Sequence, residues 1–142
     1  MKTLPSASTL AVTLPRLIGE APVVQLRALP LGYRAMLDTV YPPPAVYENG
    51  KLVQTDPPAE HQERKAYILL AESIVGDWAT STPKPTGSAK RIDWDRYAID
   101  LCAEFNAAGV TQADLLALMT GFADVNRGAA EGNGDSPERR AG

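Results

Sequence analysis

The fold is decided by the stretch from Glu60 to Trp78, which reads EHQERKAYILLAESIVGDW. Its apolar side chains recur at the three- and four-residue spacing of one helix face, at Tyr67, Leu70, Ala71, Ile74 and Trp78. Three more apolar residues, Ile68, Leu69 and Val75, widen this stripe. We therefore predict a central helix over Glu60–Thr80 that is covered on more than one side.

Three other segments have the periodicity of amphipathic helices. A short helix is predicted near Leu31–Tyr41, because three consecutive prolines follow it and proline cannot continue a helix. Two longer helices are predicted over Asp93–Ala108 and Thr111–Arg127, separated by a helix-ending glycine at Gly109. The fold class is therefore mainly α, and the predicted core comprises Leu70, Ile74, Trp78, Leu101, Phe105, Leu118 and Phe122.

A minor β element is predicted in two places. The segment Val23–Leu29 alternates apolar and polar residues, and Thr9–Leu14 alternates more weakly, so each predicts a short strand near the N-terminus. A hairpin is predicted near Ala45–Val53, because Asn49-Gly50 favours a type I′ turn. This turn would place Tyr47 opposite Leu52. The hairpin is interpreted either as a surface loop without a binding role or as a protruding hairpin that binds a partner.

The composition predicts one soluble domain. The chain has 142 residues, of which 44% are hydrophobic and 22% charged, with a net charge of -3. We predict a globular domain over residues 1–128 and a disordered tail over 129–142, since the tail has no large apolar residue. The acidic balance argues against nucleic acid as a partner, and no apolar run is long enough for a membrane span. The single cysteine fits a cytoplasmic location.

Catalytic chemistry has little support in the sequence. His61 is the only histidine, so zinc-ligand spacing is absent, and its neighbours indicate a solvated helix turn. Cys102 is the only cysteine and follows Leu101 on an apolar helix, where it is expected to pack as a small hydrophobe. We therefore predict that the protein is not an enzyme and has no catalytic, cofactor-binding or metal-binding residues.

An acidic surface is the remaining candidate site. The last two helices carry six carboxylates, and Asp100 and Glu104 lie four residues apart, where like charges repel slightly. A solvated face would explain this pair, and so would a surface that receives a basic partner. The residues predicted to bind a partner protein are therefore Asp100 and Glu104 on this surface, with Tyr47 and Leu52 on the hairpin.

The order of these parts resembles the tail assembly chaperones of long-tailed bacteriophages. In that family a strand-and-helix block resembles Val23 to Tyr41, and a helix ending in tryptophan resembles Tyr67 to Trp78. The resemblance covers roughly Pro22 to Arg127, but the hairpin and the triple proline depart from it. It implies a helper that binds the tape-measure or tail tube protein in the host cytoplasm. It also implies a frameshifted form with a C-terminal extension.

Two other functions stay open. The chain could be a small structural or connector subunit of the virion, built permanently into an oligomer. It could also be a non-enzymatic regulator that binds a host protein. The sequence leaves open whether the protein forms a homo-oligomer.

Overall fold

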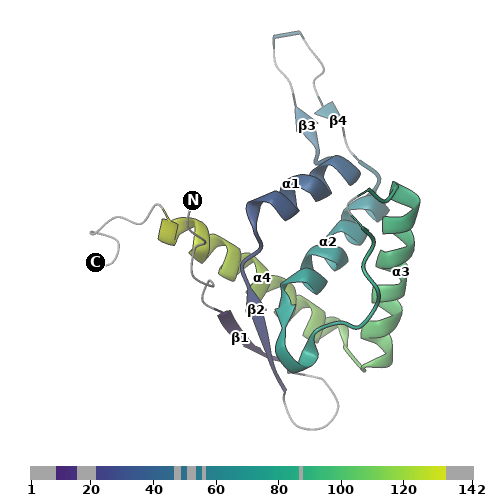
Figure 1. Ribbon diagram of the computed structural model, residues 1–142. Helices are drawn as coiled ribbons and strands as arrows, with labels where there is room; N and C mark the ends of the chain where they lie inside the picture. Colours follow the sequence, from purple (N-terminus) through teal and green to yellow (C-terminus); the bar gives the residue numbers. More distant parts are fainter. Residues whose placement is uncertain are drawn as a thin grey trace. The chain divides into compact units, whose positions relative to one another are not determined.

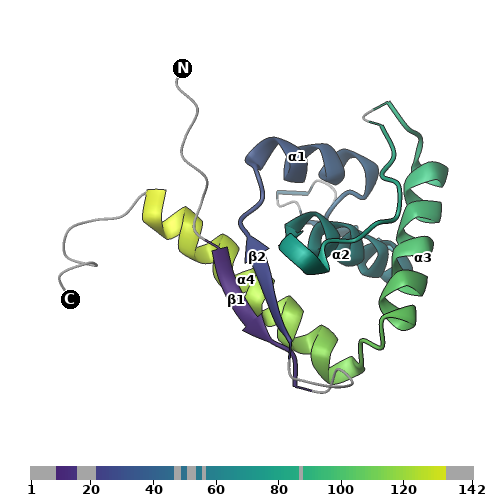
Figure 2. The same cartoon turned by 60° about the horizontal axis from the view of Figure 1, so that its bottom comes forward.

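The computed structural model describes residues 9–15, 22–46, 49–50, 54–55, 57–86 and 88–133 (Figures 1 and 2). This part contains four α-helices and a small three-stranded antiparallel sheet, which confirms the predicted mainly α class with a minor β element. The chain divides into two compact units. The sheet unit comprises Met1–Leu29, Glu72–Ala79 and Gly109–Gly142, and the helical unit comprises Pro30–Ala71 and Thr80–Ala108.

The sheet unit is built on three antiparallel strands in the order β1-β2-β5: β1 is Thr9–Thr13, β2 is Val23–Arg27 and β5 is Ile74–Val75. The alternation predicted in β2 is confirmed, because Val24 and Leu26 are buried. Both predicted N-terminal strands are therefore present, and β5 is a third strand that the sequence did not predict.

Helix α4 (Gln112–Asn133) packs on β1 and β2 of this sheet (Figure 2). The helix lies close to the sheet at Gly121, where an added Cβ atom would lie 2.4 Å from Cγ2 of Val12 and 3.1 Å from Cδ1 of Leu26. A glycine therefore stands where the helix backbone approaches two side chains of the sheet. Leu118, one turn earlier, is buried.

The start of α4 agrees with the sequence, but its end does not. The N–H of Asp114 donates to Oγ1 of Thr111, and the N–H of Thr111 donates to Oδ2 of Asp114, as in a capping box. The predicted end at Arg127 is wrong, because the helix continues to Asn133. A glycine such as Gly128 costs an exposed helix only about 1 kcal/mol, which is too little to end it. Residues 134–142 of the predicted disordered tail lie outside the described residues.

The helical unit contains α1 (Leu31–Val40), α2 (Ala59–Ser73) up to Ala71, and α3 (Arg91–Ala107) (Figure 1). Their inward faces form one buried cluster of Leu37, Tyr41, Ile68, Ala71, Trp94, Tyr97, Ala98 and Leu101. Gly109 follows α3 with a φ of 85°, the left-handed conformation predicted for it. The helices near Leu31–Tyr41 and Asp93–Ala108 are thus confirmed, although α3 begins two residues earlier than predicted.

The predicted central helix is too long at its C-terminal end. Helix α2 ends at Ser73. The next residue, Ile74, belongs to β5 and pairs with Leu26 of β2. A short 3-10 helix, η1 (Gly76–Trp78), follows β5. Two adjacent β-branched residues favour a strand when a sheet edge offers backbone partners. Gly76 then turns the chain with a φ of 82°. The prediction that Trp78 is buried is wrong, since 41% of this residue is exposed.

Most of the predicted core is buried. Leu70, Ile74, Leu101, Phe105 and Leu118 are all buried, whereas Phe122 is only half-buried. Leu70, Leu101 and Phe105 belong to the helical unit, whereas Ile74 and Leu118 belong to the sheet unit. The single globular domain over residues 1–128 therefore stays a prediction.

The predicted hairpin is present at its base and at its turn. Strand β3 (Ala45–Val46) pairs with β4 (Gln54–Thr55), and Asn49 and Gly50 have positive φ values of 61° and 78°, as a type I′ turn requires. The register differs by one residue from the prediction, because Val46 faces Gln54, whereas a two-residue turn with uninterrupted pairing would place Val53 there. The predicted pair Tyr47 and Leu52 falls outside the described residues.

Candidate functional site

The predicted partner-binding residues of α3 have different environments. Asp100 is exposed, whereas Glu104 is half-buried and faces the segment that precedes α3. The other two predicted residues, Tyr47 and Leu52, lie outside the described part of the chain. The structure therefore describes two of the four predicted residues and gives them different surroundings.

The Glu104 carboxylate anchors the loop before α3. Its Oε2 accepts hydrogen bonds from the backbone N–H of Ser81 at 2.8 Å and from the Ser81 hydroxyl at 3.2 Å. Its Oε1 accepts hydrogen bonds from the backbone N–H of Thr82 at 3.0 Å and from the Thr82 hydroxyl at 2.6 Å. Burial alone would raise the pKa of this carboxyl, but the hydrogen bonds from Thr82 and Ser81 outweigh it and hold the pKa below the ordinary value. We therefore assign Glu104 a structural role.

Most of the other carboxylates of α3 and α4 are also engaged. Asp93 accepts a hydrogen bond from the backbone N–H of Lys90. Asp95 accepts a hydrogen bond from the hydroxyl of Tyr41. Asp124 forms an ion pair with Arg127. Asp114 is buried in its capping box. Within the described residues, Asp100 is the one carboxylate of the six without a hydrogen bond or ion pair. These acidic residues therefore serve mainly to stabilise local structure.

The outer face of α3 carries apolar residues beside Asp100. Ile92 is 59% exposed and Ile99 is 56% exposed, and the seven-residue spacing places them on the same side of the helix. Arg96, Asp100 and Ala103 are also exposed on this side. We call these five residues the outer face of α3. Asp100 is one of the partner-binding residues predicted from the sequence, whereas its apolar neighbours Ile92 and Ile99 were not predicted, although their helical spacing is visible in the sequence.

Near His61 lies a partly buried polar network. The Tyr41 hydroxyl donates a hydrogen bond to Oδ1 of Asp95, and Arg64 Nη1 lies 3.4 Å from the same oxygen. The Tyr41 ring meets the His61 ring edge-on with centroids 5.8 Å apart. Burial, followed by the hydrogen bond to Asp95, raises the pKa of Tyr41. The network holds the phenol neutral and joins α1 to α3, and His61 is half-buried against it rather than fully solvated.

Cys102 lies beside Tyr67 in the helical unit. The thiol is half-buried, and the Tyr67 ring also contacts Phe105 with centroids 5.8 Å apart. Burial, followed by the hydrogen bond between the Tyr67 hydroxyl and Cys102, raises the pKa of Tyr67 to about 12. Cys102 is therefore half-buried beside the Tyr67 hydroxyl, and its packing as a small hydrophobe stays a prediction.

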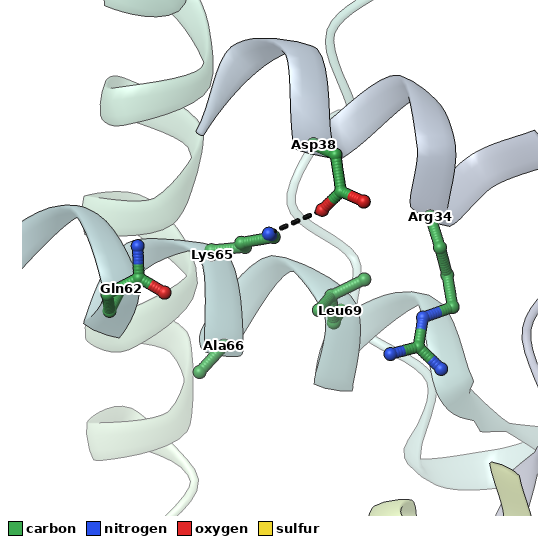
Figure 3. A pocket seen from close by; sticks show the side chains of 6 residues that line it. All are labelled: Arg34, Asp38, Gln62, Lys65, Ala66 and Leu69. Atoms are coloured by element: carbon green, nitrogen blue, oxygen red, sulfur yellow. Dashed lines mark hydrogen bonds and ion pairs between the residues drawn. The ribbon is translucent and has the colours of Figure 1, made fainter. Parts of the chain in front are cut away.

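A pocket that the sequence did not reveal lies between α1 and α2 (Figure 3). It has a volume of about 260 Å³ and is lined by Arg34 and Asp38 from α1 and by Gln62, Lys65, Ala66 and Leu69 from α2. The Lys65 ammonium donates to Oδ1 of Asp38 at 2.5 Å. These residues follow helical spacing within each helix, but only the packing of α1 against α2 brings them together.

No His, Cys, Asp and Glu side chains in the described residues gather in a group of three or more that could hold a metal ion. Within the same residues, no helix combines the length and the apolar character needed to cross a membrane. Comparison with family models, curated proteins and solved structures finds no match to this chain.

Proposed function

We propose that this chain is a non-catalytic domain that binds another protein through the outer face of α3. The exposed Ile92 and Ile99 carry this proposal, because their side chains can be buried against a partner while Arg96 and Asp100 provide polar contacts beside them. A helix whose inner face is packed and whose outer face exposes isoleucines has apolar surface available for association.

The partner that we propose is a tape-measure or tail tube protein of a long-tailed bacteriophage, and the role is that of a tail assembly chaperone. The support is the resemblance of the segment from Pro22 to Arg127 to this family in the order of its parts. A long helical client would present apolar stripes to Ile92 and Ile99. It would also present basic residues to Asp100, whose carboxylate is not engaged within the described residues.

The test is co-expression with the proteins encoded beside this one, followed by co-purification. We expect a neighbouring tail protein to co-purify with the wild type, and Ile99→Asp to reduce its recovery at least tenfold. Leu116→Asp is the matched control, because Leu116 is 59% exposed on α4, in the sheet unit. If no neighbour co-purifies with the wild type, the proposal fails. If Leu116→Asp and Ile99→Asp reduce recovery equally, the outer face of α3 is not the binding surface.

A second measurement separates a chaperone from a structural subunit of the virion. Purified particles should lack the protein if it acts only during tail assembly. Quantitative mass spectrometry of the particles measures this directly. A stoichiometric amount in the particles would favour the structural or connector subunit.

A further inference from the structure

Among the described strands, the three-stranded sheet has two edges, which are formed by β1 and β5 (Figure 2). The β5 edge is only two residues long, and Gly76 turns the chain directly after it. Strand β1 has five residues, and its register with β2 runs without a bulge along its whole length. Of these two edges, β1 is therefore the one that can accept a further strand.

The hydrogen-bond pattern of β1 indicates which of its backbone groups point away from β2. The N–H of Leu14 donates to the carbonyl of Pro22, the position that faces it when the same register is continued. Antiparallel strands alternate hydrogen-bonded and non-hydrogen-bonded pairs, so every second residue of β1, counted back from Leu14, directs its backbone groups toward β2. The N–H and C=O groups of the other residues, Thr9, Ala11 and Thr13, point outward. None of the described strands pairs with them.

This edge also lacks the features that usually prevent pairing with another strand, such as charged side chains, proline or a bulge. The sequence of β1 is Thr-Leu-Ala-Val-Thr, which contains no charged residue and no proline. Thr9, Ala11 and Thr13 are exposed, whereas Leu10 and Val12 are half-buried beside Gly121 of α4. The strand therefore offers backbone donors, backbone acceptors and part of an apolar face to a partner strand.

The sequence of β1 is nearly symmetrical about Ala11, and this symmetry favours a second copy of the chain as the partner. When two β1 strands pair antiparallel about Ala11, Thr9 of one chain faces Thr13 of the other. Leu10 of one chain then faces Val12 of the other, which buries more of both side chains. Cross-strand threonine pairs stabilise antiparallel strands, and no like charges meet in this register. A two-fold interface brings the same surface of both chains together, which a symmetrical strand satisfies.

We infer that two copies of this chain form a dimer by antiparallel pairing of their β1 strands about Ala11. The pairing joins the two sheets into one sheet with the order β5-β2-β1-β1-β2-β5. Opposite residues of paired strands point to the same face, so both α4 helices lie on one face of the joined sheet. Helix α4 contacts β2 as well as β1, which sets it back from the two-fold axis. The β1 edge belongs to the sheet unit and the outer face of α3 to the helical unit, so the inference does not depend on the proposed function.

The first test is the mass of the purified full chain, measured by sedimentation equilibrium over a range of concentrations. We expect a reversible dimer. Ala11→Lys places like charges opposite each other at the two-fold axis and should weaken the dimer at least tenfold. Ile99→Asp, on the outer face of α3, is the control and should leave the dimer affinity unchanged. A monomeric wild type overturns the inference, and so does a dimer that Ala11→Lys leaves intact.

A charge exchange within β1 separates loss of pairing from loss of folding. Thr9→Lys combined with Thr13→Lys places like charges at both ends of the paired strands and should dissociate the dimer. Thr9→Lys combined with Thr13→Glu places opposite charges there and should retain it. Thermal unfolding verifies that both proteins are folded. Equal dimer affinities of the two double variants would contradict the inference.

Cysteine cross-linking tests the register, after Cys102→Ala has removed the one native thiol. In a hydrogen-bonded antiparallel pair the Cα atoms are about 5.5 Å apart, within the disulfide range of about 4.4–6.8 Å. Ala11→Cys should therefore form a disulfide-linked dimer when oxidised glutathione is added. Thr13→Cys is the matched control and should not cross-link, because its two Cα atoms would lie about 13 Å apart, four residues along the strand. Equal cross-linking of the two variants, or none with Ala11→Cys, overturns the inference.

Discussion

The hydroxyl of Tyr41 donates a hydrogen bond to Oδ1 of Asp95 over 2.5 Å and joins the end of α1 to the first turns of α3. The adjacent carbonyl of Val40 accepts a hydrogen bond from Nε of Arg91 at 3.2 Å. The three prolines after Tyr41 stop α1, so its last carbonyl groups need partners outside the helix. Two side chains of α3 therefore hold the end of α1: Arg91 donates to the carbonyl of Val40, and Asp95 accepts from the hydroxyl of Tyr41.

Removing the Tyr41 hydroxyl should destabilise the protein. Tyr41→Phe keeps the ring but deprives Asp95 of its shortest hydrogen bond, and we expect a loss of about 1.5–3 kcal/mol in the free energy of unfolding. Denaturant unfolding at neutral pH measures this loss. Asp95→Asn retains an oxygen acceptor and should cost less than Tyr41→Phe. A Tyr41→Phe protein within 0.5 kcal/mol of wild type, a roughly neutral effect, would show that the hydrogen bond is dispensable.

Truncation of the helical core should have a large effect. Leu101 is fully buried between its neighbours in α1, α2 and α3, so Leu101→Ala should cost about 2–5 kcal/mol through lost burial and a residual cavity. Leu116→Ala, at an exposed leucine of α4, is the control and should change stability by less than about 0.5 kcal/mol. Equal losses in the two variants would mean that Leu101 does not face a packed core.

The Glu104 carboxylate should make stability depend on acid pH. Its pKa is lowered in the folded state from the ordinary value of 4.5, so the stabilisation is fully present above that pH and is lost as the pH falls through the lower folded value. Glu104→Gln should be less stable than wild type at pH 7, and the difference should shrink at acid pH. Unfolding curves across this range provide the measurement. A difference independent of pH would contradict the anchoring role.

Two glycines in helices should respond in opposite ways to alanine. Gly121→Ala brings a Cβ atom to 2.4 Å from Val12, so the cost of overpacking, about 1–3 kcal/mol, should exceed the gain in helix propensity of about 1 kcal/mol. Gly32→Ala has no heavy atom within 4 Å of the new Cβ atom and should stabilise α1 by up to about 1 kcal/mol. Thermal unfolding of the two variants measures both effects. A stabilising Gly121→Ala would show that the contact between α4 and the sheet is loose.

Local signals in the sequence were sufficient to predict a structural feature where the interacting residues lie within one or two helical turns of each other in the chain. The capping box of Thr111 and Asp114, the left-handed Gly109 and the turn at Asn49 and Gly50 all depend on neighbouring backbone atoms. The periodicity of α1, α3 and the first part of α2 likewise located the helices. These features could be predicted because the interacting groups are close in sequence.

Tertiary structure decided the features that depend on distant partners. Helix α2 ends at Ser73 because β2 offers backbone hydrogen bonds to Ile74 and Val75, a partner that helical periodicity cannot reveal. From the sequence alone, Glu104 was interpreted as a surface charge. In the structure its carboxylate accepts four hydrogen bonds from Ser81 and Thr82, which lie in the loop before α3. The sequence by itself determined which segments are helices and where most of them start. Packing determined where α2 stops, which carboxylates are engaged and where the pocket forms, because burial and hydrogen bonding join residues that are far apart in the chain.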